Sequence, residues 1–288
     1  MKTTHIYKRT KQGAAIRADV YNRGKGSPVL LYFHGGGFIF GDRNWLPREQ
    51  IDYFTQEGFS IISFDYRLAP ETKLEQIVED LKDALNWARH TAIPDYQFHP
   101  DKVAVIGSSA GAYLSLLAGT MAVKPLAVIS LYGYGDIAGD WIASPSEHYR
   151  RKPIVAQADA YRAIGETEIS EGPWARFQFY LFCRQHGVWL SEVTGFDAIQ
   201  KPELLMQYCP LSTLNSQFPP TLLLHGDRDT DVPLEQSIAF HEKLKELGVP
   251  SKLIVIKDGE HVFDQDFANP QVKRAFEEIV LFLRERMD

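Results

Sequence analysis

The stretch VIGSSAGAYL, residues 105–114, joins an apolar run to the start of a helical pattern and decides the fold. Its centre, residues 107–111, fits the pattern G-x-S-x-G, in which a serine stands on a tight turn between a strand and a helix. Such a turn strains the serine backbone and leaves no room for side chains two residues away on either side. Because Ser109 has glycine at both of those positions and Ser108 has neither, Ser109 is the candidate nucleophile.

Short apolar runs alternate with helical patterns on both sides of this stretch. The runs predict strands at residues 4–8, 14–20, 29–33, 60–64, 103–107, 126–133, 221–226 and 252–257. Helical periodicity predicts helices at residues 73–90, 109–122, 233–248 and 270–287. Continuous Val, Ile and Leu runs separated by helices indicate a parallel sheet that is covered on both faces. The predicted class is therefore α/β, with a mostly parallel central sheet flanked by helices.

Residues 135–208 break this alternation with helical patterns, many aromatic side chains and no convincing strand. The segment is too long for an ordinary loop. We interpret it as a helical cap inserted into an α/β core formed by residues 1–134 and 209–288. A separate helical subdomain with no role at the site is the alternative. The aromatic residues would either line an apolar pocket or form the core of the cap; they are Trp141, Trp174, Phe177, Phe179, Tyr180, Phe182, Trp189 and Phe196.

Composition excludes several classes of function. The 288 residues carry a net charge of −6 and are 44% hydrophobic, which favours a sizeable core and gives no electrostatic reason to bind nucleic acid or an anionic membrane. No apolar run is long enough to span a membrane, and the polar first residues do not resemble a signal peptide. We expect a soluble cytoplasmic protein with no stable membrane insertion and with reduced thiols at Cys183 and Cys209. Exposed sheet edges would allow a homodimer.

A second motif, HGGGF at residues 34–38, follows the expected strand 29–33. Consecutive glycines let the backbone approach a substrate closely and direct N–H groups toward it. Gly36 and Gly37 are therefore candidate oxyanion donors. Ala110 is the third candidate, since it follows the nucleophile at a helix N-terminus. We expect His34 to hold this loop by a hydrogen bond, and the P-loop and dinucleotide-binding patterns are absent.

A serine nucleophile needs a general base and a carboxylate that orients the base. Five histidines follow Ser109 in the chain, and His261 is the best candidate because it stands in a loop directly after the expected strand 252–257. The carboxylate is expected from the loop after strand 221–226, where Asp227, Asp229 and Asp231 compete. Asp231 is also well placed to cap the next helix, so spacing alone leaves the choice of aspartate open.

Together these motifs resemble the α/β-hydrolase superfamily, and within it the esterases and lipases similar to hormone-sensitive lipase. The matching pieces are HGGGF at 34–38, DYRLAPE at 65–71, GSSAG at 107–111, HGDRDTDVP at 225–233 and GEH at 259–261. The resemblance implies Asp229 as the acid beside Ser109 and His261, and a structural role for Asp65 and Arg67. Ser108 and Ala112 depart from residues that are common in this family.

The resemblance implies a serine esterase that uses Gly36, Gly37 and Ala110 as oxyanion donors and needs no cofactor and no metal. The expected substrate is a small-molecule ester with a small or short acyl chain. The motifs leave amide, peptide, lactone and thioester bonds open, because fold and triad do not determine the substrate. A hydrolase fold that only binds a small molecule is a third hypothesis, although such proteins typically lack one member of the triad.

Overall fold

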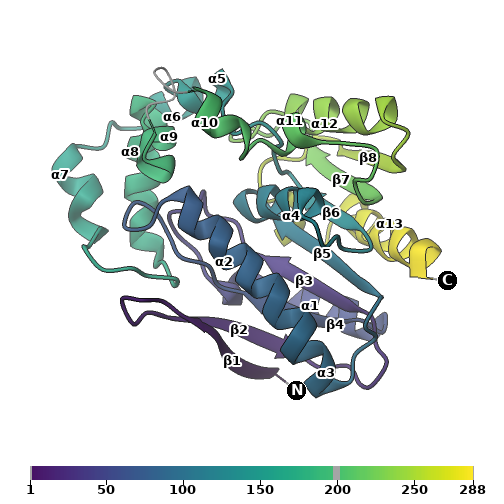
Figure 1. The fold of residues 1–288 in the computed structure, drawn as a ribbon. Helices are drawn as coiled ribbons and strands as arrows, with labels where there is room; N and C mark the ends of the chain where they lie inside the picture. The colour runs from purple at the N-terminus through teal and green to yellow at the C-terminus, as the bar shows by residue number, and fades with distance from the viewer. Residues whose placement is uncertain (1, 197–201, 288) are drawn as a thin grey trace.

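An eight-stranded sheet forms the centre of the protein, whose computed structural model describes residues 2–196 and 202–287 (Figure 1). The strands follow the order β1-β2-β4-β3-β5-β6-β7-β8 across the sheet. β2 runs antiparallel to β1 and β4, and the remaining neighbours are parallel. The strands are β1 Lys2–Arg9, β2 Ala15–Tyr21, β3 Val29–Phe33, β4 Ser60–Phe64, β5 Val103–Ser108, β6 Val128–Leu131, β7 Thr221–Gly226 and β8 Ser251–Ile256. The predicted α/β class with a mostly parallel sheet is confirmed.

The burial of each strand follows its composition. Every residue of β3, β4, β6 and β7 is buried, as continuous apolar runs require when both faces of a sheet are covered. β1 lies at one edge of the sheet and is largely exposed, with charged residues along its length. Charged side chains on an edge strand oppose further strand pairing. The polar N-terminal strand therefore protects one edge of the sheet.

Helices cover both faces of the sheet. One buried cluster joins the sheet to α1 Arg48–Gln56 and α13 Pro270–Met287. The other joins the opposite face to α2 Leu74–Trp87, the π-helical turn η2 Ala88–Ala92, α3 Ile93–Tyr96, α4 Ala110–Thr120 and α12 Glu235–Glu246. In α2, Leu74, Ile77, Val78 and Leu81 are buried, which is the spacing of one apolar face. The expected helices are confirmed, except that α12 begins at Glu235 rather than at Pro233.

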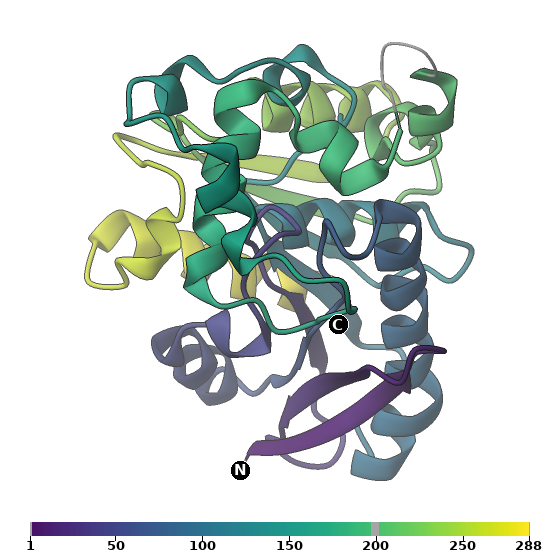
Figure 2. The same cartoon turned by 90° about the vertical axis from the view of Figure 1, so that its left-hand side faces the viewer.

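Between β6 and β7 the described residues form short helices and no strand of the sheet. They are α5 Asp140–Ala143, α6 Glu147–Arg150, α7 Gln157–Ala160, η3 Tyr161–Ala163, η4 Trp174–Arg176, α8 Phe177–His186, α9 Trp189–Thr194, α10 Pro202–Met206 and α11 Pro210–Thr213. Figures 1 and 2 show α6, α8 and α9 together beyond one end of the sheet. One isolated β-bridge, Gly41 to Gly172, ties this segment to the chain after β3. The helical character agrees with the interpretation as a cap, while its bounds at 135 and 208 stay a prediction.

Buried ion pairs anchor the segment DYRLAPE. Asp65 is fully buried and lies 2.6 Å from the guanidinium of Arg43, which belongs to the short helix η1 Arg43–Trp45. Arg67 is bonded to Asp80 at 2.8 Å. These contacts agree with the structural role expected for Asp65 and Arg67. The local sequence could not identify Arg43 or Asp80 as a partner, because each belongs to a different element from the DYRLAPE segment.

Two further expectations concern the thiols and the membrane. Cys183 and Cys209 are both buried and free. Burial raises the pKa of the Cys209 thiol to about 11, so the neutral form is favoured. Within residues 2–196 and 202–287, no helix combines the length and apolar character that crossing a bilayer requires.

Candidate active site

Ser109 stands on a strained turn between β5 and α4. Its φ of 54° and ψ of −119° lie outside the conformations that most residues adopt. A Cβ atom on Gly107 would lie 2.2 Å from the carbonyl oxygen of Gly111, and one on Gly111 would lie 2.0 Å from that of Phe33. Neither distance is tolerable for a carbon atom. The two glycines therefore permit the turn, and Ser109 is held where its side chain reaches a neighbouring loop.

Three of the predicted site residues meet at the carboxyl ends of β5, β7 and β8. His261 Nε2 lies 3.0 Å from Ser109 Oγ, and His261 Nδ1 lies 2.7 Å from Asp229 Oδ2. In this arrangement Nδ1–H donates to the carboxylate, which leaves Nε2 free to accept the serine proton. The imidazole is 18% exposed and the carboxylate is fully buried. The structure thus joins a hydroxyl, an imidazole and a carboxylate in one chain of hydrogen bonds.

The surroundings of Asp229 favour its ionised form. Its Oδ1 accepts the N–H groups of Asp231 and Val232, both at 2.9 Å. Its Oδ2 faces His261 and also lies 3.4 Å from His225 Nε2. Burial alone would raise the pKa of Asp229, but the contacts with His225 and His261 outweigh burial and hold the pKa well below its usual range. A fixed negative charge therefore faces the imidazole.

The pKa of His261 is shifted in the opposite direction, upward. Burial favours the neutral imidazole, yet the hydrogen bond and charge of Asp229 outweigh it, and Asp231 and Asp264 add to the effect. The pKa of His261 is consequently raised above its ordinary value. A raised pKa increases the strength of the neutral imidazole as a base. The site can therefore accept a proton from Ser109 and stabilise the imidazolium that results.

The glycine loop after β3 borders the same site, and Gly36 and Gly37 line its cavity. Gly37 has a φ of +59°, and a Cβ atom there would lie 2.4 Å from the ring of Tyr180. Ala110 is the first residue of α4, where a backbone N–H has no partner inside the helix. In the described part of the chain, no hydrogen bond outside regular helices and strands uses the N–H of any of these three residues. The three predicted oxyanion donors are thus available to a ligand.

His34 supports this loop from behind. The imidazole is fully buried, its Nδ1 donates to the carbonyl of Gly35 at 2.7 Å, and the ring stacks on Tyr66 at 4.2 Å. Burial lowers the pKa of His34 to about 4, so the ring is neutral near pH 7. These contacts agree with the expected role of His34 in holding the loop.

The cavity in front of Ser109 has a volume of about 520 Å³, the size of a small-molecule site. Four aromatic residues of the predicted cap, Tyr149, Trp174, Phe177 and Tyr180, line it together with Phe40 and Trp45 from the chain after β3. Trp174 stacks on Phe177 with a centroid distance of 4.7 Å. Other cap aromatics such as Phe179 and Trp189 are buried in the core instead. Both alternatives for these residues therefore occur, in different members of the set.

A buried polar network behind the nucleophile was not predicted. Tyr132 Oη donates to Asp264 Oδ1 at 2.6 Å, and Gln50 Nε2 donates to Asp264 Oδ2 at 2.7 Å. The tyrosine ring of Tyr132 contacts His261 edge-on, with centroids 4.7 Å apart. Beside it, Tyr32 Oη lies 3.0 Å from Ser108 Oγ. Gln50 and Asp264 lie 214 residues apart, so no local pattern could have joined them.

Asp231 does not cap helix α12, which was one of the two roles that the sequence allowed for it. The N-cap residue of α12 is Leu234, and Asp231 instead lines the cavity. Its Oδ1 accepts a hydrogen bond of 2.6 Å from Tyr180 Oη. The hydroxyl comes from α8, so the contact depends on the tertiary structure. Asp231 is thus a cavity residue, whereas the sequence had left it open as a candidate triad acid or a helix cap.

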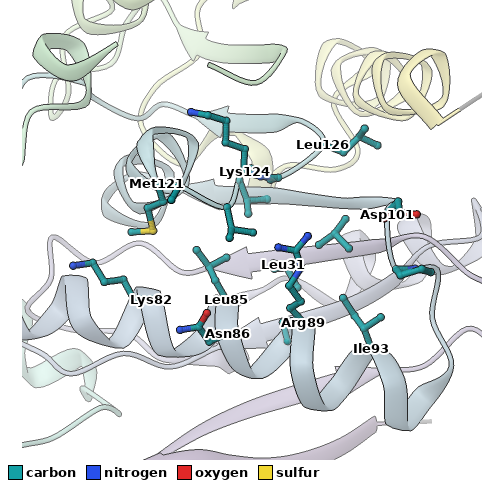
Figure 3. A pocket seen from close by; sticks show the side chains of 17 residues that line it. Leu31, Lys82, Leu85, Asn86, Arg89, Ile93, Asp101, Met121, Lys124 and Leu126 are labelled. Carbon is teal, nitrogen blue, oxygen red and sulfur yellow. The ribbon is translucent and has the colours of Figure 1, made fainter. Parts of the chain in front are cut away.

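A second groove, of about 630 Å³, lies between α2 and the chain after α4 (Figure 3). Leu85, Ile93 and Met121 line it, and the charged side chains of Lys82 and Arg89 also border it. Among the described residues that line this groove there is no serine, histidine or cysteine. The chemistry of nucleophile and base is therefore found in the cavity at Ser109.

Comparisons with known proteins agree on the fold of this chain. A family model described as the alpha/beta hydrolase fold matches residues 30–265. A protein of unknown function from Staphylococcus aureus is 25% identical, with a TM-score of 0.80 and 100% of both chains covered. An alpha/beta hydrolase superfamily protein from Enterococcus faecalis is 24% identical, with a TM-score of 0.78 over 99% of each chain. A butyrate-bound esterase from Thermogutta terrifontis is 19% identical, with a TM-score of 0.67 over 98% of this chain and 93% of that one.

Similarity to curated proteins extends to much larger enzymes. The non-reducing polyketide synthase ausA of Emericella nidulans is 28% identical over 94% of this chain. The synthase of the same name from Penicillium brasilianum is 29% identical over 91% of this chain. In each case the match covers 13% of the synthase. This chain therefore spans a small part of the length of these relatives.

Proposed function

This chain belongs to the alpha/beta hydrolase family, and from that premise we propose that it is a serine carboxylesterase that cleaves small or short-chain acyl esters. The observation that carries the proposal is the continuous contact from Ser109 through His261 to Asp229, at 3.0 and 2.7 Å. A hydroxyl, a base and an orienting carboxylate in this order constitute an activated nucleophile. We assign these three residues as the catalytic triad.

In the acylation step, Ser109 Oγ attacks the ester carbonyl carbon while His261 Nε2 takes the hydroxyl proton. Asp229 keeps the proton on Nδ1 and stabilises the imidazolium by its charge. The tetrahedral intermediate collapses when the bond from carbon to the alcohol oxygen breaks and His261 gives its proton to that oxygen. An acyl-enzyme on Ser109 and a free alcohol result.

The negative oxygen of the tetrahedral intermediate is assigned to the N–H groups of Gly36, Gly37 and Ala110. One such donor typically contributes about 3 kcal/mol to the stability of the transition state. Water then attacks the acyl-enzyme with His261 as base, which releases the acid and restores the serine. The proton that His261 takes from this water passes to Ser109 Oγ when the bond between the acyl carbon and Oγ breaks.

The size of the cavity favours small esters over esters with long acyl chains. A volume of about 520 Å³ between aromatic walls suits a short acyl group and a small alcohol. The esterase of T. terrifontis, which shares the fold, has been crystallised with butyrate and with propionate bound. The polyketide synthases are matched over too little of their length to transfer their substrates to this chain.

The proposal is tested by hydrolysis of p-nitrophenyl esters from acetyl to dodecanoyl. Wild type should turn over the short chains best, and Ser109→Ala should lose at least about 1000-fold in kcat. Ser216→Ala, which changes an exposed serine, is the matched control and should equal wild type. If Ser109→Ala retained wild-type activity, Ser109 would not be the nucleophile. Comparison of p-nitrophenyl acetate with p-nitroacetanilide separates ester from amide cleavage, and faster anilide cleavage would contradict an esterase.

A further inference from the structure

The cavity at Ser109 combines carboxylates with aromatic rings. Asp231 and Asp264 are its acidic lining residues, and among the described lining residues there is no lysine or arginine. Aromatic faces and a carboxylate attract organic ammonium groups through the ring quadrupole and through direct charge. The aromatic lining residues include Tyr149, Phe177 and Tyr180. This combination favours a substrate that carries a positive charge.

Of the two acids, Asp231 is the one with an available oxygen. Both carboxylate oxygens of Asp264 accept hydrogen bonds, from Tyr132 and Gln50. Asp231 Oδ1 accepts from Tyr180, and its backbone N–H donates to Asp229 at 2.9 Å. Tyr149 also interacts with this carboxylate, because a side-chain hydrogen bond with Asp231 contributes, after burial, to the raised pKa of Tyr149. The carboxylate is therefore held by Tyr180 through Oδ1, has Tyr149 beside it, and directs Oδ2 toward His261 Nε2 at 3.7 Å.

The open oxygen lies beside the position of the leaving group. Asp231 Oδ2 is 3.7 Å from His261 Nε2, the atom that must protonate the departing alcohol. A leaving oxygen that receives this proton lies about 3 Å from Nε2, and hence within about 7 Å of Oδ2. An ammonium nitrogen two carbons away from that oxygen spans about 3 to 4 Å. At that upper limit about 3 to 4 Å remain between the nitrogen and Oδ2, a gap that one hydrogen bond can bridge.

The guanidinium of Arg184 also lies near this carboxylate, on the side of its other oxygen, Oδ1. Its Nη2 lies 3.7 Å from Asp231 Oδ1 and donates to the Asp231 carbonyl at 3.1 Å. Its side chain is 3% exposed and lies over the rings of Trp141 and Tyr149. Arg184 therefore weakens the long-range field of Asp231 and leaves the short-range contact at Oδ2 open.

The geometry points to Asp231 as a substrate-binding residue that selects esters of amino alcohols, with the ammonium group two carbons from the ester oxygen. The ammonium binds Asp231 Oδ2 and rests against the aromatic wall of Tyr180, Tyr149 and Phe177. The inference rests on the proposed esterase function, since it names the alcohol part of that substrate. One charge-assisted hydrogen bond corresponds to a preference of about tenfold or more in kcat/KM.

The test compares two esters of the same shape. At a pH at which the amine is protonated, 2-(dimethylamino)ethyl butyrate and 3-methylbutyl butyrate differ by a charged nitrogen in place of a CH group. Wild type should prefer the amino ester about tenfold or more. Asp231→Asn keeps an acceptor for Tyr180 but removes the charge, so the ratio of kcat/KM between the amino ester and the neutral ester should fall to about one. Asp227→Asn, an exposed aspartate in the same loop, should keep the preference.

A ratio near one in wild type overturns the inference, and so does a preference that survives in Asp231→Asn. If Asp231 merely anchors α8, the kcat/KM values for both esters would decline together in Asp231→Asn. The ratio of the two values would then stay unchanged, and this result also overturns the inference. Should that variant fail to fold, inhibition of wild type decides: N,N-dimethylethanolamine should compete with p-nitrophenyl butyrate about tenfold better than 3-methylbutanol. Equal inhibition counts against the inference.

The two proposals fail separately. If wild type hydrolyses p-nitrophenyl butyrate through Ser109 but shows no preference for the amino ester, the substrate class is wrong and the esterase stands. If Ser109→Ala matches wild type on p-nitrophenyl butyrate, the esterase proposal itself is wrong, whatever the ratio between the two alkyl esters.

Discussion

Replacement of Gly37 by alanine should disable the proposed oxyanion donors in the glycine loop after β3 without unfolding the protein. The new Cβ atom would lie 2.4 and 2.7 Å from two ring carbons of Tyr180 and 3.5 Å from Trp189 Nε1. Carbon atoms pack at about 3.5 to 4 Å, so loop and ring must separate by about 1 Å. Both the loop and the Tyr180 ring are held in place. Tyr180 is hydrogen-bonded to Asp231, and the Gly37 carbonyl accepts a hydrogen bond of 3.0 Å from Trp189.

Two effects set the magnitude of this change. A left-handed conformation, with φ at +59°, costs an alanine about 1–2 kcal/mol, and the overpacked methyl group costs about 1–3 kcal/mol more. Displacing a donor N–H from the oxyanion is the larger effect on rate. We expect kcat to fall about 100-fold or more. The free energy of unfolding should fall by about 2–5 kcal/mol.

The assay measures kcat and KM with p-nitrophenyl butyrate beside urea unfolding. Gly248→Ala is the matched control, because Gly248 has a φ of +69° and nothing within 4 Å of a built Cβ atom. It should show the backbone cost in stability and no loss of kcat. A Gly37→Ala enzyme within about threefold of wild type in kcat would refute the argument that the loop is held rigidly against Tyr180.

Two other predictions concern the pair Asp229–His261 and the buried ion pair Glu71–Arg176. The raised pKa of His261 places the acid limb of kcat/KM above the ordinary histidine value, since only the neutral imidazole accepts the serine proton; Asp229→Asn should move that limb to lower pH and cut kcat about 10⁴-fold. A limb that does not move in the pH profile would contradict the assignment. Glu71→Gln should lower the free energy of unfolding by about 3 kcal/mol or more in urea, because it leaves the guanidinium of Arg176, 1% exposed and bonded at 2.7 Å, without its carboxylate. Asp159→Asn, in the exposed pair with Arg162, should change little, and an equal effect of the two would count against burial as the cause.

The sequence by itself determined the features that depend on local backbone geometry and on apolar periodicity. Ser109 could be chosen over Ser108 because the turn excludes side chains at residues 107 and 111, a demand that two glycines meet within five residues. The central strands β3, β4, β6 and β7 could be placed because a strand buried on both faces is largely apolar. The glycine loop followed from its position after β3, and His261 from its position after the apolar run of β8.

The tertiary structure decided which distant side chains meet. Spacing in the loop after β7 left Asp227, Asp229 and Asp231 open, and a family resemblance was needed to select Asp229. The contact of Asp231 with Tyr180 spans 51 residues, and that of Gln50 with Asp264 spans 214. Such pairs leave no periodic signal, because a hydrogen bond depends on how the elements pack and not on their order in the chain. The sequence left open whether the cap aromatics line a pocket, and only the packing of the elements around Ser109 decides which of them do and that Asp231 and Asp264 lie among them.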